Sequence, residues 1–166
     1  MSWTDPKTWQ TGEALTASDM NTHIKDNLNA LKAPPTEHYE CDEASDYTTT
    51  STSFVDVDAT SLSLTIVTTG GDVLIGFCGF FQQSAAVVFL DVHESVGNAR
   101  LAGDDGIARP GNGFEFVSFI WLATGLDAGS HTFKLQWKVS AGTGTLYAGA
   151  GGTSLDLHPQ FWVREI

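Results

Sequence analysis

The hydrophobic repeat of this chain changes once along its length, and that change most constrains the fold. Between residues 16 and 32 apolar residues recur every three or four positions, the spacing of one helix face. From residue 39 onward they recur at every second position, which is typical of strands. Pro34-Pro35-Thr36 lies between the two patterns and reads as a stiff linker. The sequence therefore predicts an N-terminal segment and helix over residues 1–36 and a β domain over residues 37–166.

The N-terminal helix is expected over residues 16–32. Thr16 is a favourable N-cap, and Asp19, three residues later, completes a pair that resembles a capping box. Pro34-Pro35 stops the helix. Four apolar residues share one face of it, and we call them the helix stripe: Met20, Ile24, Leu28 and Leu31.

So narrow a stripe suits one seam of a short helix bundle, so we expect it to bind the same stripe of other copies. Packing against its own domain is the alternative. A seam of two to three heptads is marginal by itself. The pattern therefore also predicts a second surface for association between copies.

Two tryptophans, Trp3 and Trp9, stand in the irregular segment before the helix. Each ring can bury roughly 200 Å², so it is unfavourable in water. Docking on a partner is the favoured interpretation, because so short a segment has little core of its own. Folding back onto the chain's own domain is the alternative.

The pattern in the remainder of the chain predicts eight to ten strands with no helix between them, separated by turns rich in Gly, Asn and Asp. This pattern predicts a mainly β fold, an antiparallel β-sandwich or jelly roll preceded by the short amphipathic helix. The clearest expected strands are Leu62–Ile66, Val73–Phe81, Ala85–Val92, Phe114–Leu122, Thr132–Val139, Thr145–Ala150, Ser154–Leu157 and Phe161–Glu165.

Two of these strands, Val73–Phe81 and Phe114–Leu122, carry large apolar groups on both faces. One face of each belongs to the core of the sandwich. The second face needs another cover, which is either ordinary burial within the sandwich or an interface with other copies of the chain.

Charge excludes some classes of function. The chain has 8 Lys and Arg against 20 Asp and Glu, a net charge of −12, so a nucleic-acid partner is not expected. Seven carboxylates fall within residues 37–58, where a solvated face is favoured over a cation site. No apolar run approaches the roughly 18 residues of a membrane span, and the N-terminus does not resemble a signal peptide, so neither membrane insertion nor secretion is expected.

No pattern for catalysis or for a cofactor emerges. Asp91 and His93 alternate on one strand, but no third metal ligand is identifiable, so a solvent-facing polar edge is favoured. Asp104-Asp105 beside a glycine is typical of a turn. Cys41 and Cys78 are expected to be free thiols, with Cys78 in a core strand. We therefore expect no enzyme, no metal and no cofactor.

The stretch from Trp3 to Lys32, above all Asn-Thr-His-Ile-Lys-Asp-Asn-Leu at positions 21–28, resembles a module at the start of many structural proteins of tailed bacteriophages. Residues 125–137 and the closing residues 163–166 are similar to the last strands of phage fibre and head-fibre sandwiches, which look like the tumour necrosis factor and C1q sandwiches. The resemblance implies a virion protein, often a homotrimer, that attaches to other virion proteins through its N-terminal segment.

This resemblance leaves a tail fibre or receptor-binding role and a head-decoration role both open. The competing class of function is a carbohydrate-binding module, which would make host-surface carbohydrate a partner. Such a module needs exposed aromatic rings beside polar groups, and the candidates are Tyr147, Trp162 and the loop at Asn112. The helix stripe counts against this class, because a free module needs no surface for self-association.

Overall fold

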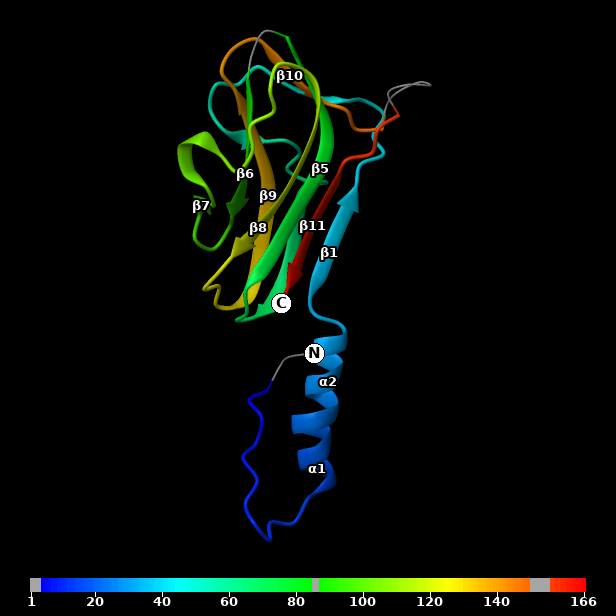
Figure 1. Cartoon of the computed structure of the whole chain (residues 1–166), viewed down its shortest axis with the longest axis vertical. Coiled ribbons are helices and arrows are strands. Elements are labelled where there is room, and N and C mark those ends of the chain that lie inside the picture. Colours follow the sequence, from blue (N-terminus) through cyan, green and yellow to red (C-terminus); the bar gives the residue numbers. More distant parts are fainter. Residues whose placement is uncertain (1–3, 85–86, 150–155) are drawn as a thin grey trace. The chain divides into compact units, whose positions relative to one another are not determined.

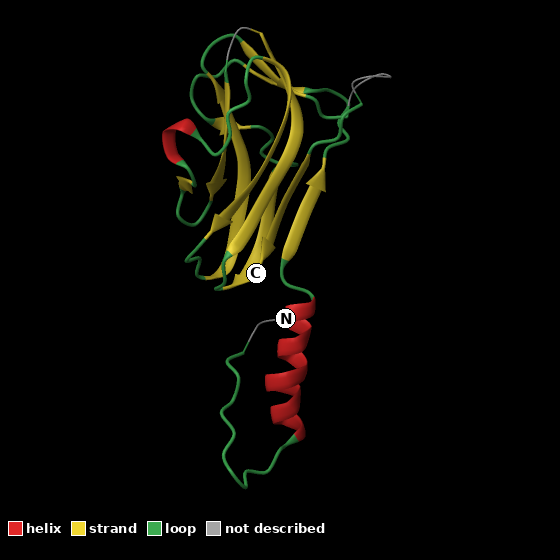
Figure 2. Ribbon diagram, in the orientation of Figure 1, coloured by secondary structure: helices red, strands yellow, loops and turns green. Residues whose placement is uncertain are grey.

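The computed structural model describes residues 4–84, 87–149 and 156–166. The chain divides into two compact units, Met1–Pro35 and Thr36–Ile166. The first unit contains the helix and the second contains all the named strands (Figures 1 and 2). None of the helices in the described part of the chain is long and apolar enough to cross a membrane.

The N-terminal helix is continuous from Ala17 to Lys32 and confirms the expected helix. It consists of α1 (Ala17–Met20), a π-helical turn η1 (Asn21–Lys25) and α2 (Asp26–Lys32). Thr16 is the N-cap, because its hydroxyl accepts a hydrogen bond from the backbone N–H of Asp19 at 3.1 Å. The π-helical turn was not predicted from the spacing of apolar residues.

The second unit is a sandwich of two antiparallel sheets. The first sheet runs in the order β1 (Thr36–Glu40), β11 (Gln160–Glu165), β5 (Val73–Ser84), β10 (Thr143–Leu146) and β2 (Tyr47–Thr49), with β8 (Gly113–Ala123) on the other side of β5. In the second sheet, β3 (Val55–Asp56) and β4 (Ser63–Thr69) both pair with β9 (Ala128–Val139), which is followed by β6 (Val88–Glu94) and β7 (Ala99–Arg100). A short 3-10 turn, η2 (Gly103–Asp105), follows β7.

This arrangement confirms the predicted fold class, a mainly β antiparallel sandwich preceded by a short helix. The chain passes repeatedly from one sheet to the other, as in a jelly roll: between β2 and β3, β4 and β5, β5 and β6, β7 and β8, β8 and β9, and β9 and β10. Alternate side chains point inward, so Phe81 of the first sheet meets Trp137 of the second with ring centroids 6.4 Å apart.

Strand β5 determines which surfaces of the first sheet stay open. One edge of β5 pairs with β8 from Val73↔Ala123 to Gln83↔Gly113, and the other edge is shared by β11 and β10. Within the described ranges, β8 pairs only with β5 and therefore forms an edge of the sheet.

Some expected strands differ from the observed ones. Strands β1, β2, β3 and β7 were not predicted, because they are short and polar and form by pairing with distant partners. The strand expected over 154–157 is wrong at residues 156 and 157, which lie in no strand, and its other residues lie outside the described ranges. Of the run expected from residue 85, the described strand begins at Val88, and residues 85–86 are likewise outside.

Candidate functional site

The helix stripe is exposed along its whole length. The exposed fractions are 45% for Met20, 42% for Ile24, 60% for Leu28 and 66% for Leu31. Complete burial of one such side chain stabilises a protein or a complex by about 1.5–3 kcal/mol. The stripe is therefore a surface that gains free energy when another apolar surface covers it.

Hydrogen bonds of Asn27 hold the segment before the helix against the helix, and Asn27 is only 4% exposed. The backbone N–H of Thr4 donates to Asn27 Oδ1 at 2.9 Å, and Asn27 Nδ2 donates to the Thr4 carbonyl at 2.7 Å. His23 Nδ1 lies 3.1 Å from the Asp5 carbonyl. The segment therefore runs back beside its own helix (Figure 1). This contact was not predicted from the sequence.

Trp9 lies in this fastened segment and is 39% exposed. The Lys7 ammonium sits 4.8 Å from the centroid of its ring. Lys7 also pairs with Glu13, and with Asp19 at 3.3 Å; the hydrogen bond to Glu13 is the main reason why the pKa of Lys7 is raised. These contacts orient Trp9 and leave part of its ring open. Trp3 lies outside the described residues.

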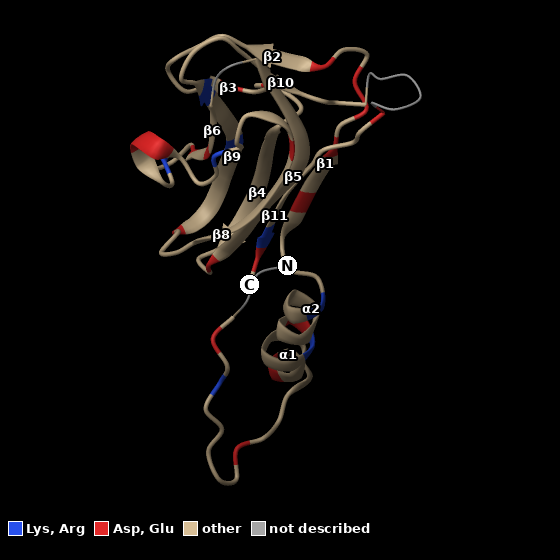
Figure 3. Ribbon diagram, turned by 45° about the horizontal axis from the view of Figure 1, so that its top comes forward, with Lys and Arg blue, Asp and Glu red and all other residues tan. Residues whose placement is uncertain are grey.

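A second apolar surface covers the solvent side of β5 and β8, and we call it the β5–β8 outer face. Glu115 is the only charged residue of the two strands (Figure 3). Because side chains alternate between the two faces of a strand, Glu115 belongs to the opposite face of β8. Four large side chains of β8 on this face are well exposed: Phe114 at 52%, Phe116 at 53%, Ile120 at 67% and Leu122 at 45%. The face also includes Ser118 of β8 and Leu74, Gly76, Cys78, Phe80 and Gln82 of β5.

Aromatic rings pack against one another at the end of this face that contains Phe114. The ring of Phe80 stacks on Phe114 with centroids 5.2 Å apart, and it contacts Phe116 at 4.9 Å. At the other end, Trp162 lies over Gly76, where an added Cβ would come within 2.2 Å of the indole ring. Gly76 is therefore required for this close approach. The two strands with apolar residues on both faces thus differ: β5 is largely covered, whereas β8 stays open.

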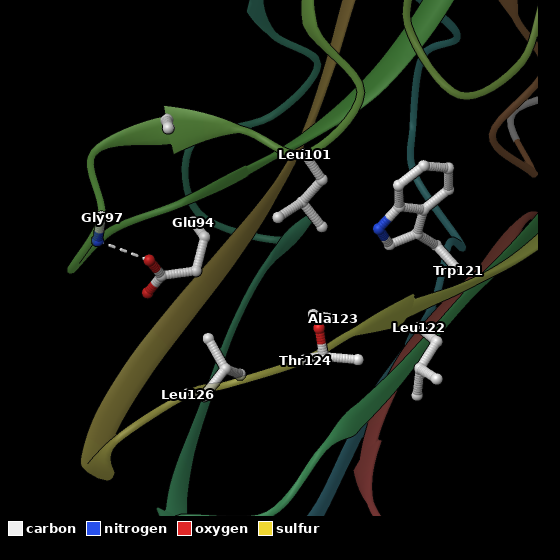
Figure 4. Close-up of a pocket in the computed structure, with 9 residues that line it drawn as sticks. Glu94, Gly97, Leu101, Trp121, Leu122, Ala123, Thr124 and Leu126 are labelled. Carbon is white, nitrogen blue, oxygen red and sulfur yellow. Dashed lines mark hydrogen bonds between the residues drawn. The ribbon is translucent and has the colours of Figure 1, made fainter.

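A shallow pocket of about 360 Å³ lies between the β6–β7 turn and the end of β8 (Figure 4). Its lining is mostly apolar and includes Leu101, Trp121 and Leu126. Glu94 is the only titratable side chain among the nine described residues that line it. The Glu94 carboxylate accepts hydrogen bonds from the backbone N–H groups of Val96 at 2.8 Å and Gly97 at 2.6 Å.

Glu94 also pairs with His131, whose Nδ1 lies 3.0 Å from Glu94 Oε1, and both side chains are buried. Burial by itself would raise the pKa of Glu94, but these hydrogen bonds outweigh it and hold that pKa below its ordinary value. Burial likewise opposes the charged form of His131, but the bonds to Glu94 and to the Asp127 carbonyl raise its pKa. The carboxylate is therefore engaged in structure and is not free for acid–base chemistry.

The other titratable candidates also have structural roles. Asp91 is fully buried, so the expectation of a solvent-facing edge was wrong: its Oδ1 accepts from the N–H groups of Val92 and Ala102, and its Oδ2 lies 3.7 Å from Arg100 Nε. Asp104 and Asp105 lie in the turn η2. Over residues 4–84, 87–149 and 156–166, no cluster of three or more His, Cys, Asp or Glu side chains is placed to hold a metal ion.

The two cysteines are free thiols. Cys41 is fully buried, and burial raises the pKa of its thiol to about 12. Cys78 lies in the central strand β5, but on the β5–β8 outer face and half-buried rather than in the core. Of the residues considered for sugar binding, Tyr147 is only 6% exposed and Trp162 is packed over Gly76, whereas Asn112 lies in an exposed loop.

No protein-family model matches the chain, and no curated protein matches it. Solved structures with some likeness include the infectious bursal disease virus VP2 subviral particle, at 12% identity and a TM-score of 0.41, and the Gx strain of that virus, at 13% and 0.41. In both cases the match covers 79% of this chain and 37% of the other. A pentameric capsid protein from metagenomic phage sequences has 14% identity and a TM-score of 0.30, over 96% of this chain and 80% of that one.

Proposed function

We propose that the chain is a non-enzymatic structural protein of a bacteriophage particle, a homotrimer that attaches through its N-terminal unit and presents the β-sandwich outward. It serves as a tail fibre or receptor-binding protein, or as a decoration of the head. The proposal rests on the helix stripe. Its four apolar side chains are 42–66% exposed, and an exposed apolar helix face of this kind indicates a surface that binds a partner. The likeness of residues 3–32 to the phage attachment module supports this assignment.

The titratable groups support a role without catalysis. The carboxylate in the described pocket, Glu94, is held by two backbone N–H groups and by His131. The buried Asp91 is enclosed by backbone donors and Arg100. In both arrangements backbone N–H groups and a basic side chain engage the carboxylate, which suits a structural role.

The full chain is expected to associate in solution, because the helix stripe and the β5–β8 outer face both gain free energy on being covered. The resemblance to phage virion proteins implies that the oligomer is a homotrimer. Sedimentation at micromolar concentration should show a species of three times the chain mass of 17.8 kDa. A single species of monomer mass under these conditions would contradict the trimer.

The sandwich is expected to fold without the N-terminal unit, because the two units are compact separately and β1 begins at Thr36. A fragment of residues 36–166 should keep a cooperative thermal transition but should no longer join particles that assemble in its presence. The full chain, added at the same concentration, is the control. Normal incorporation of the fragment would mean that attachment resides in the sandwich.

A further inference from the structure

We infer that the β5–β8 outer face is where copies of this chain meet, and that in each copy it is covered by the same faces of the neighbouring copies around the three-fold axis of the proposed homotrimer. The inference rests on the self-association in the proposed function and names a surface for it, separate from the helix stripe. Unlike the stripe, this surface lies on the folded sandwich, on strands of eleven and twelve residues.

The exposed apolar side chains of the face supply a large part of the area that an interface needs. The four well-exposed side chains of β8 are 45–67% exposed. They leave roughly 400 Å² of apolar surface per copy, about half of what each partner contributes to a standard protein interface. Leu74 and Phe80 of the same face are partly exposed and add to this area, and the neighbouring Trp162 of β11 extends it.

Charge favours a second copy as the occupant. The chain carries a net charge of −12, so two copies repel each other over most orientations. The ten residues of the β5–β8 outer face bear no charge, so contact through this face brings no carboxylates together on either side. A basic partner would gain nothing from this face, because it offers no acidic group. An identical face offers apolar surface without like charge.

The place of β8 in the sheet supports the same occupant. A long exposed edge strand with apolar side chains is a surface that proteins cover or interrupt. In the part of the chain that the structure describes, no strand covers the free edge of β8, and its outer side chains carry no charge that would prevent pairing or packing. Packing between copies buries these outer side chains without a further domain.

The test compares two full-length variants that add the same charge at equally exposed β-branched residues. Ile120→Glu lies on the β5–β8 outer face, where Ile120 is 67% exposed, and Val67→Glu lies on β4 of the other sheet, where Val67 is 66% exposed. Ile120→Glu is expected to weaken association at least about thirtyfold and to sediment as a monomer at micromolar concentration. Val67→Glu should behave as the unmodified chain, and both should keep the thermal transition of a folded sandwich.

Labelling of Cys78 by a thiol reagent gives a second measurement on the same face. Cys78 is half-buried at its centre, whereas Cys41 is fully buried and serves as an internal reference. Cys78 should react several times more slowly in the unmodified chain than in Ile120→Glu. The inference is overturned if Ile120→Glu stays oligomeric. It is also overturned if the unmodified chain is a trimer whose Cys78 reacts as fast as Cys78 of the variant. In both cases the proposed trimer stands, and the contact between its copies lies elsewhere. An unmodified chain that is a monomer would also overturn the inference, together with the proposed trimer.

Discussion

Replacement of Glu94 by alanine is expected to lower the free energy of unfolding by about 3–5 kcal/mol. Glu94 and His131 are 5% and 3% exposed, and their side chains pair at 3.0 Å. Removal of the carboxylate leaves a buried imidazole without its charged partner and removes the acceptor of the N–H groups of Val96 and Gly97. Urea unfolding at pH 6 measures the loss.

The matched control is Asp104→Asn. Asp104 also pairs with a basic side chain, Arg100, at 3.0 Å, but its own side chain is 99% exposed. An exposed pair of this kind contributes little, so a change below about 0.5 kcal/mol is expected. If the two variants lost similar amounts of stability, the structural role of the buried pair would be disproved.

The same pair predicts how stability depends on pH. The pKa of His131 is raised in the folded chain, so its contribution is complete below the ordinary value of 6.5 and is lost as pH rises through the folded pKa. The pKa of Glu94 is lowered, so its contribution is complete above the ordinary value of 4.5 and is lost as pH falls through the folded pKa. The pair therefore stabilises the fold most between these two values, and Glu94→Gln should flatten the decline above pH 6.5.

The elements that were predicted correctly are those whose signals are local. The helix is specified by its cap at Thr16, its stop at Pro34-Pro35 and the apolar spacing between them. Strand β4 alternates strictly, with Leu64 and Ile66 buried and Thr65 and Val67 exposed. Such patterns need no knowledge of what the element pairs with.

The elements that were missed depend on distant partners. Strand β1 has a polar sequence, and it is a strand because Thr36 to Glu40 pair with Arg164 to Gln160, more than a hundred residues away. Likewise, Glu94 and His131 are separated by 37 residues, and neither position indicates a buried pair by itself. Alternation says which face of a strand is apolar, but it does not say whether a long-range neighbour covers the strand.

The candidate surfaces show the same division. The helix stripe was evident from spacing, and the two strands with apolar residues on both faces were recognised. That β5 is central and β8 lies at the edge follows only from the order of strands in the sheet. The contact between Asn27 and Thr4 was missed for a related reason: a backbone partner has no signature in the sequence.

The two tryptophans of the N-terminal segment are expected to be the largest contributors to attachment. If they fill pockets on a virion partner, as aromatic hot spots do, Trp3→Ala or Trp9→Ala should cost about 2 kcal/mol or more of binding free energy. That is about a thirtyfold loss of affinity per site, multiplied across the copies of an oligomer. Co-sedimentation of the purified variants with particles that lack this protein measures the loss.

Trp9 has contacts within its own unit and an exposed part of its ring, so its replacement distinguishes the two interpretations of this residue. Trp9 is 39% exposed, and Lys7, which is fixed by Glu13 and Asp19, sits over its ring, so part of the indole is already held by its own unit. If the ring packs only within the N-terminal unit, Trp9→Ala should lower thermal stability and leave attachment nearly intact. If the ring binds the virion partner, Trp9→Ala should weaken attachment and leave thermal stability nearly unchanged. Leu15→Ala is the matched control, because Leu15 is 56% exposed in the same segment but offers no aromatic ring. The fastening of the segment to Asn27 favours attachment, since a segment held in place before binding loses less conformational entropy when its tryptophan docks.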